Sequence, residues 1–421
     1  MKICIVGCGN QSTGLAGLLA QESKVESILF LGRRMSTMAA AKAQIETLGE
    51  RMGDTRIDCL ELDCHDSDAV ARATRGCAVI FNGTTPAFNL PLMKAALLAG
   101  ANYMDVWSNG MAAPGIPYEE TIDAQMELDN DFRQAGLTAV PACGLSGFDE
   151  LAAGYMARDM DRVDAVIVRV MDWIDSTELL APLPPAQVFD LWLGAPGPTV
   201  LIDGKICHIP LLESEESFDF PAPIGRQTVY TFAKNPELPL LQRLFPEPIG
   251  RIEVKMGISM GGLAMKDVWL QALSEQTAKH TGAENMFELF AEPLDRHNES
   301  FDQLMDQGIL KGAALSATVE VTGEKDGAPR RHTMYHTTTL EESTKHLPWT
   351  GHNVYGTVGG IVLELILTMG RGDLPEKGTL NLADLSDAQG WFRRFRARGH
   401  LVGEKIEYGN GIFVEAREKT K

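Results

Sequence analysis

Residues 3–14 of the chain read Ile3-Cys4-Ile5-Val6-Gly7-Cys8-Gly9-Asn10-Gln11-Ser12-Thr13-Gly14. The apolar run at the start predicts a buried strand, and the small apolar residues over 15–22 predict a helix. Gly7 suits a tight turn between them, and Gly9 lets the backbone approach a pyrophosphate at the helix N-terminus. The stretch therefore predicts a dinucleotide-binding turn, whose candidate contacts are Gly7, Gly9, Asn10, Gln11 and Ser12.

The dinucleotide fingerprint G-x-G-x-x-G has a third glycine, whose place Ser12 occupies here. Either Ser12 substitutes as a small residue, or the local spacing differs and Gly14 takes the part. A purely structural turn is the alternative, because a degenerate glycine motif is a weak signal by itself. The motif has the required context of a strand, a helix and further such units, and this favours dinucleotide binding.

Short apolar strands alternate with helices through the first third of the chain. The predicted strands are 3–6, 28–31, 58–62, 78–82, 103–107 and 137–141, and the predicted helices are 15–22, 37–51, 67–75, 90–99 and 118–135. This alternation predicts right-handed βαβ units in an α/β fold, with a doubly wound parallel sheet. We expect a Rossmann domain over residues 1–148.

After residue 148 the pattern changes to that of a second, α+β domain over 149–350. The predicted elements are a strand at 163–170, an irregular proline- and glycine-rich stretch at 182–248, helices at 284–291 and 300–307, and an antiparallel hairpin of 314–321 and 331–338 joined by 322–330. An apolar helix at 355–369 and another helix at 383–398 follow, and 386–421 forms a C-terminal segment.

The composition is that of a globular protein with a strong negative charge. The 421 residues include 38 Lys and Arg against 57 Asp and Glu, a formal net charge of -19 at pH 7. Such a surface repels phosphate backbones and anionic lipids, so we expect no nucleic-acid or membrane partner. The seven cysteines form no C-x-x-C pair, which predicts reduced thiols and a cytoplasmic location. No signal peptide is expected at Met1, and the apolar run 359–369 predicts a buried helix.

The residues after the second predicted strand indicate whether the cofactor is NAD or NADP. An NAD site places a carboxylate about 20 residues beyond the fingerprint, to hold the ribose 2′-hydroxyl. This chain has Arg33, Arg34 and Ser36 there instead. Two guanidinium groups with a hydroxyl behind them suit a 2′-phosphate, which predicts NADP(H). The alternative is that both arginines are merely solvated.

The carboxyl ends of the other strands carry further candidates, because ligands of an open α/β sheet bind there. The candidates for cofactor binding are Asp63, Cys64, Asn82, Gly83 and Thr84. An acid, Asp105, and a thiol, Cys143, are predicted to converge with flexible glycines near a nicotinamide. The histidines at 332 and 336 lie in a predicted strand, where their spacing is too wide for one metal ion, so no metal site is expected.

Several motifs together resemble the saccharopine dehydrogenase (glutamate-forming) family, which includes lysine 6-dehydrogenase and carboxynorspermidine dehydrogenase. They are the N-terminal Gly-x-Gly, Leu62-Asp63 followed by Asp66, Tyr103-x-Asp105, the run Gly136–Gly144 and, more weakly, Phe218–Gly225. The resemblance implies a Rossmann domain to which residues 351–385 return, and an α+β domain that binds substrate and forms a homodimer. It also implies NAD(P)-linked interconversion of an amine and an imine on an opine- or amino-acid-like substrate.

The resemblance suggests roles for site residues. Asp105 is a candidate to stabilise an iminium cation, with a sheet-end hydrogen-bonding role as an equal alternative. Cys143 is a second catalytic candidate, although a packed apolar thiol is the more common situation. The sequence after Gly144 departs from the Asp-Pro-Gly turn of the family, so the substrate pocket is expected to differ.

A substrate carboxylate requires a cation, and the second domain offers Arg169, Arg226 and Arg251, of which Arg226 is slightly favoured. The predicted substrate contacts are Gly144, Phe148 and Arg226. A noncatalytic dinucleotide sensor and an oxidoreductase acting on a C–O bond remain alternatives. A sensor would bind the cofactor without oxidising or reducing any amine or ketone.

Overall fold

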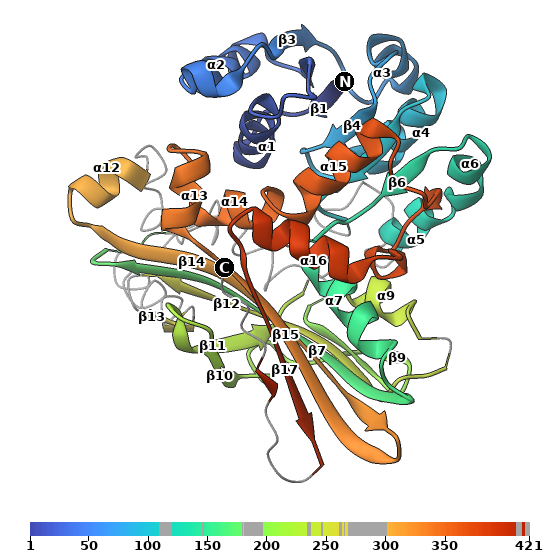
Figure 1. Cartoon of the computed structure of the whole chain (residues 1–421), viewed down its shortest axis with the longest axis vertical. Coiled ribbons are helices and arrows are strands. Elements are labelled where there is room, and N and C mark those ends of the chain that lie inside the picture. The colour runs from blue at the N-terminus through green and yellow to red at the C-terminus, as the bar shows by residue number, and fades with distance from the viewer. Residues whose placement is uncertain are drawn as a thin grey trace, which may run out of the picture. The chain divides into compact units, whose positions relative to one another are not determined.

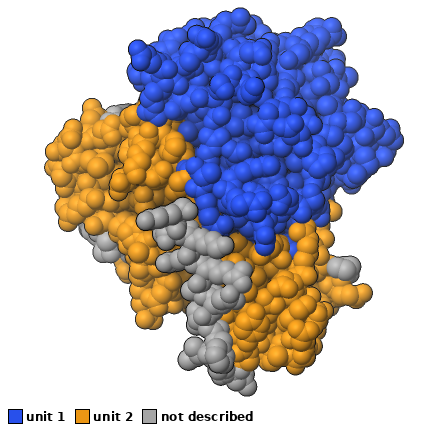
Figure 2. Space-filling model, viewed as in Figure 1, with its two compact units in different colours: residues 1–154, 357–398 blue, residues 155–356, 399–421 orange. Residues whose placement is uncertain are grey.

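The computed structural model describes residues 1–108, 120–144, 147–178, 180, 197–233, 237–245, 247–260, 263–264, 266–267, 301–409 and 415–416. The chain forms two compact units, coloured separately in Figure 2. Unit 1 comprises 1–154 and 357–398, and unit 2 comprises 155–356 and 399–421. The predicted segment 386–421 is therefore not a separate part, because its helix belongs to unit 1 and its strand extends the sheet of unit 2.

Unit 1 contains a seven-stranded parallel sheet in the order β16-β6-β5-β4-β1-β2-β3. Its strands are β1 (Lys2–Val6), β2 (Ser27–Gly32), β3 (Arg56–Glu61), β4 (Val79–Asn82), β5 (Asn102–Asp105), β6 (Thr138–Val140) and β16 (Gly378–Thr379). Its helices include α1 (Asn10–Ala20), α2 (Met35–Glu46), α3 (Ser67–Ala73), α4 (Asn89–Ala99), α5 (Glu120–Met126), α6 (Asp129–Gln134) and most of α7 (Phe148–Ala157). This confirms the predicted doubly wound fold, although the single helix expected at 118–135 is two helices.

The returning part of unit 1 adds α15 (Ile361–Arg371) and α16 (Ala388–Ala397). The prediction of one continuous helix over 355–369 is wrong, because α14 (His352–Val358) ends before α15 begins. A Cβ on Gly360 would lie 1.7 Å from the ring of Phe395 in α16, so only glycine allows this close approach. By length and composition 352–371 passes as a membrane span, but 89% of its window is buried, as in a core helix.

Unit 2 contains an eleven-stranded sheet, and Figure 1 shows α13 and α14 on one of its faces. The strands are β7 (Arg162–Ser176), β8 (Thr199–Ile202), β9 (Lys205–His208), β10 (Glu216–Phe220), β11 (Gly225–Thr231), β12 (Arg251–Met260), β13 (Leu263–Ala264), β14 (Leu310–Lys325), β15 (Ala328–Thr339), β17 (Leu401–Tyr408) and β18 (Glu415–Ala416). The helices are α9 (Glu237–Gln242), α12 (Phe301–Asp306), α13 (Leu340–His346) and α14.

Two expectations for unit 2 are wrong. The described part of 182–248 is not irregular, because it contains β8, β9, β10 and β11. The loop expected at 322–330 is a two-residue turn, since Lys325 pairs with Ala328. Asp326 and Gly327 both have positive φ, 52° and 74°, as a type I′ hairpin turn requires. Helix α12 confirms the prediction at 300–307, and the helix predicted at 284–291 lies outside the described residues.

A buried polar cluster fastens α14 to the sheet of unit 2. The side chain of Asp172, on β7, lies 2.6 Å from Nε2 of His352 through Oδ1 and accepts a 2.6 Å hydrogen bond from Asn353 through Oδ2. The Asp172 and His352 side chains are completely buried. Removal of one partner would leave the other polar group without compensation in the interior.

We therefore expect His352→Ala to lower the free energy of unfolding by about 3–5 kcal/mol, as for other broken buried pairs. Urea unfolding of the whole chain measures this change. His208→Ala is the matched control, because His208 is exposed at the end of β9. Equal stability of the two variants would contradict a structural role for the cluster.

Candidate functional site

The turn after β1 is shaped for close approach of a ligand to the backbone. Gly7 has φ +86°, and a Cβ there would lie 2.6 Å from Cγ2 of Thr84. Gly9 is the N-cap of α1 and has no side-chain cap, and a Cβ on it would meet nothing within 4 Å. The N-terminus of α1 therefore opens onto free space, where its N–H groups and dipole favour an anion.

Ser12, and not Gly14, takes the place of the third glycine of the fingerprint in the contact between helix and sheet. Its side chain is buried in the first turn of α1, and Oγ donates a 3.4 Å hydrogen bond to the carbonyl oxygen of Gly83. A Cβ on Gly83 would lie 1.9 Å from that Oγ. The contact between helix and strand is thus made by Ser12 against Gly83 at the end of β4, and Gly14 lies further along the helix.

The residues after β4 form a tight turn beside the glycines. Oδ1 of Asn82 accepts hydrogen bonds from the backbone N–H of Thr84, at 2.9 Å, and from its hydroxyl, at 2.6 Å. The N–H of Gly83 donates to the carbonyl oxygen of Val6 at 3.0 Å. The structure therefore brings together two groups of predicted cofactor contacts, residues 7–12 and 82–84.

The region after β2 is exposed, including Arg33, Arg34 and Ser36. Oε2 of Glu61, at the end of β3, accepts a 3.1 Å hydrogen bond from the backbone N–H of Met35 at the start of α2. Sequence reasoning missed this carboxylate, because it comes from a neighbouring strand. Two cations and one carboxylate thus face solvent at this end of the sheet.

The two candidates after β3 differ in exposure. Asp63 is exposed and binds the N–H of His65 at 3.1 Å, a hydrogen bond that lowers the pKa of the Asp63 carboxyl. Cys64 is buried, and burial raises the pKa of its thiol to about 11. Asp63 is therefore available to a ligand, whereas Cys64 packs into the core of unit 1.

A buried hydrogen-bond network joins the ends of β4, β5 and β6. Asp105 accepts from the N–H of Ala142 at 2.7 Å and from Nε2 of Gln125 at 2.8 Å, one bond to each carboxylate oxygen. Oε1 of Gln125 accepts from Oγ of Ser108 at 2.6 Å and from Nδ2 of Asn89 at 3.1 Å. Asn89 in turn accepts a 2.7 Å bond from Nδ2 of Asn82.

Sequence reasoning missed Asn89, Ser108 and Gln125. The available signal was the presence of uncharged polar side chains in or beside otherwise apolar segments. Buried amides need hydrogen-bond partners, so such residues point to an interior network, but they do not say which strand end it serves.

The network holds Asp105 in an interior site. Asp105 is only 1% exposed. Burial raises the pKa of its carboxyl to about 7, although its hydrogen bonds act in the opposite direction and lower the pKa. The geometry is that of the sheet-end hydrogen bonder considered from the sequence. A proton on this carboxyl exchanges near neutral pH, which also keeps it a candidate for proton transfer.

Cys143 follows β6 and is completely buried. Burial is the main cause that raises the pKa of its thiol well above the ordinary value, and the nearby Glu150 and Asp105 raise it further. A thiol with so high a pKa is a weak nucleophile, because the thiolate is the reactive form. Its surroundings are those of a packed side chain.

The predicted substrate contacts fall in different places. Gly144 has φ +64° and directly follows Cys143. The ring of Phe148 is buried, 5.8 Å from the ring of Phe392 and 6.0 Å from that of Phe395, so it supports the interior of unit 1. Arg226 lies in unit 2, exposed on β11, and its Nε donates to Oγ of Ser217 at 2.9 Å.

Within the described residues, no group of three or more His, Cys, Asp or Glu side chains is arranged to hold a metal ion. His332 and His336 lie on β15, as the strand prediction required. Nε2 of His332 lies 2.8 Å from Oε1 of Glu404.

Comparisons with known proteins show what the chain resembles. Residues 3–140 match the model of the saccharopine dehydrogenase NADP binding domain. Carboxynorspermidine synthase from Vibrio cholerae serotype O1 is 23% identical over 412 residues, with 92% of each chain covered. Saccharopine dehydrogenase (L-Glu forming) from Saccharomyces cerevisiae superposes with a TM-score of 0.62 at 12% identity, covering 96% of this chain and 99% of that one. Residues 3–140 therefore match the saccharopine dehydrogenase NADP-binding domain, and the chain has the fold of the yeast saccharopine dehydrogenase.

Proposed function

We propose that this protein is an NADP(H)-dependent oxidoreductase that acts on a C–N bond of an opine- or amino-acid-like amine or imine. The observation that carries the proposal is the open N-terminus of α1 at Gly9, on a parallel sheet whose sequence matches an NADP-binding domain. The names of the relative from Vibrio cholerae and of the yeast structure support an amine-type substrate.

Each part of unit 1 has a role in this proposal. Backbone N–H groups at the start of α1 bind the pyrophosphate, and Arg33 and Arg34 bind the 2′-phosphate. A nicotinamide cofactor held by these residues would supply or accept the hydride. Asp105 holds or releases a proton near neutral pH, while Cys143 remains a neutral thiol. A homodimer in the cytoplasm is part of the proposal, and light scattering at twice the chain mass would support the dimer.

Cofactor preference gives the first test. We expect NADPH to bind more tightly than NADH, and Arg34→Ala to weaken NADPH binding by about tenfold or more, because a hydrogen bond to a charged group is lost. NADH affinity should stay unchanged. Nicotinamide fluorescence titration measures both constants, and Arg56→Ala, an exposed arginine on β3 paired with Asp58, is the control. Equal binding of the two nucleotides would contradict the assignment.

Substitutions at two glycines distinguish an effect on cofactor binding from an effect on folding. Gly9 has φ -73° and space around its Cβ position, so Gly9→Val should fold normally and bind NADPH about 100-fold or more weakly. Gly83→Ala places a Cβ against Ser12 and should instead lower the melting temperature. Calorimetry and the same titration make the comparison. A Gly9→Val variant with wild-type affinity would place the cofactor elsewhere.

Asp105 gives a pH-dependent test. Its folded-state pKa of about 7 lies above the ordinary value for an unfolded chain, about 4. Its contribution to stability is therefore complete below about pH 4 and is lost as the pH rises through 7. Asp105→Asn should remove this loss, as measured by urea unfolding at pH 5 and pH 8.

The same variant tests a role in turnover. If Asp105 transfers a proton, Asp105→Asn should lower kcat/KM by about 100-fold or more and abolish an inflection near pH 7 in its pH profile. Amine oxidation with NADP⁺ and imine reduction with NADPH are the assays. Near-wild-type activity in the variant would restrict Asp105 to its structural hydrogen bonds.

A further inference from the structure

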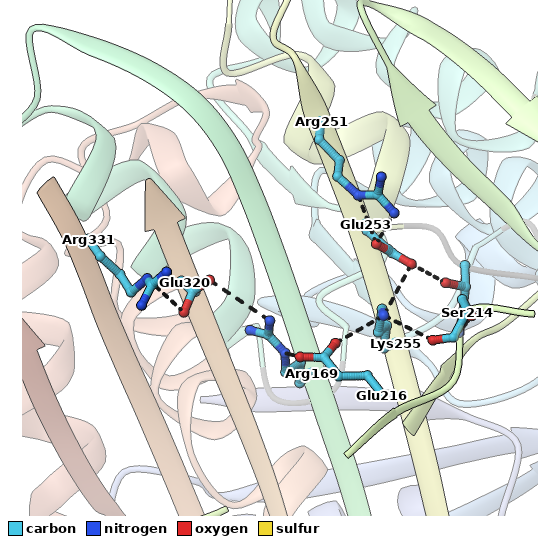
Figure 3. Close-up of polar contacts among 9 residues, drawn as sticks. Arg169, Ser214, Glu216, Arg251, Glu253, Lys255, Glu320 and Arg331 are labelled. Carbon is cyan, nitrogen blue, oxygen red and sulfur yellow. Dashed lines mark hydrogen bonds and ion pairs between the residues drawn. The ribbon is translucent and has the colours of Figure 1, made fainter. Parts of the chain in front are cut away.

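A network of charged side chains crosses one face of the sheet in unit 2, as Figure 3 shows. Arg169, on β7, lies between two carboxylates. Its Nε is 2.9 Å from Oε1 of Glu216, its Nη2 is 3.8 Å from Oε1 of Glu320, and the guanidinium lies 4.6 Å from the ring centroid of Phe218. The Arg169 side chain is only 9% exposed. It is therefore a buried cation whose orientation is fixed from two sides.

The neighbouring charges balance one another. Lys255, on β12, lies 3.0 Å from Oε2 of Glu216 and 3.5 Å from Oε1 of Glu253. At one end of the network Arg251 pairs with Glu253. At the other end Arg331 pairs with Glu320 and Glu407. Each of the four cations thus has a carboxylate, so the network as a whole exerts no strong pull on an anion.

Two hydrogen-bond donors within this face have no acceptor. Nη1 of Arg169 and Oγ1 of Thr318 are buried and form no hydrogen bond with any other residue in the described part of the chain. Thr318 is 2% exposed. A buried donor without an acceptor destabilises the fold, so two such donors on one face of the sheet indicate a site for an acceptor from outside the chain.

Strand register places Arg169 and Thr318 side by side in the sheet. Arg169 on β7 pairs directly with Thr318 on β14, and it pairs on its other side with Lys255 on β12. Directly paired residues point to the same face with Cβ atoms about 4.5–5.5 Å apart. An arginine N–H and a threonine O–H from neighbouring residues of one face can donate to the two oxygens of one carboxylate.

The other candidate arginines lack this arrangement. Arg226 is exposed and donates to Ser217, and Arg251 is 46% exposed with Nε and Nη2 both donating to Glu253. The slight preference for Arg226 drawn from the sequence therefore finds no support in its surroundings. Arg169 combines burial, fixed orientation and a remaining N–H donor.

We propose that Arg169 and Thr318 bind the carboxylate of a small amino-acid-like ligand on this face of unit 2. The identification of that ligand as the substrate rests on the proposed function, whereas carboxylate binding itself does not. Guanidinium is suited to this task, because its planar N–H groups match the geometry of a carboxylate.

Calorimetric titration of the full chain with glutarate, without nucleotide, tests the site. We expect glutarate to bind and its neutral analogue glutaramide to bind at least about tenfold more weakly, because a charged acceptor strengthens the hydrogen bonds. Thr318→Val removes one donor at nearly constant volume and should weaken glutarate binding by about tenfold. It removes a buried hydroxyl without an acceptor, so the variant should fold at least as stably as the wild type.

Thr322→Val is the matched control, since Thr322 lies on the same face of β14 but about 13 Å away along the strand. Its glutarate affinity should equal that of the wild type. Arg169→Lys, which keeps the charge and loses the planar fork, should also weaken binding, with folding checked by circular dichroism.

Three results would overturn the proposal. They are no glutarate binding at millimolar concentration, equal binding of glutarate and glutaramide, and unchanged glutarate affinity in Thr318→Val. The last result would mean that a water molecule, and not the ligand, satisfies the hydroxyl. Any of these results together with selective NADPH binding and amine turnover would leave the proposed function intact, whereas carboxylate binding without NADPH binding would contradict the function alone.

Discussion

The contact between Ser12 and Gly83 sets the position of α1 against the sheet of unit 1. Because Gly83 has no side chain, the first turn of α1 lies directly against the end of β4. This position fixes the direction of the helix, and with it the N–H groups that follow Gly9. The backbone around the turn is held by β1, whose neighbours in the sheet are β4 and β2. A larger residue at position 83 would displace the helix end on which the anion site depends.

A buried hydrogen-bond network also orders this end of the sheet. The chain of side-chain hydrogen bonds from Asn82 through Asn89 and Gln125 to Asp105 connects the ends of β4 and β5, and the backbone N–H of Ala142 links Asp105 to the end of β6. Parallel strands end at one edge of the sheet, where their last backbone groups lack ladder partners. The amide side chains supply hydrogen-bond partners in the interior at this edge. The loops that follow the strands therefore begin at fixed positions.

The sequence was most informative where a strand is buried on both faces. The strands of unit 1 are short apolar runs, and turn residues mark their ends, so the order of elements and the glycine turn could be predicted. The strands β8, β9, β10 and β11 could not, because they are short, β9, β10 and β11 are partly exposed, and proline and glycine residues lie between them. The break between α14 and α15 was missed for another reason. It depends on the ring of Phe395, which is distant in sequence from Gly360.

The site was predictable to a similar extent. The residues that form the glycine turn could be named, because their roles depend on the local backbone. The surroundings of Asp105, Cys143 and Phe148 could not, because burial depends on segments that pack on them from elsewhere in the chain. Glu61 and Thr318 illustrate the same limit, since the importance of each follows from its register with a neighbouring strand or helix.

The edge strand β16 has a consequence for synthesis of the protein. It pairs with β6, yet residues 141–377 separate the two strands in the chain. A ribosome adds roughly 5–20 residues per second, so the edge of β6 waits on the order of tens of seconds for its partner. During that interval the nascent sheet carries an open edge, and the three residues of β6 limit the length available for pairing with another chain. The first domain to emerge is thus among the last to be completed.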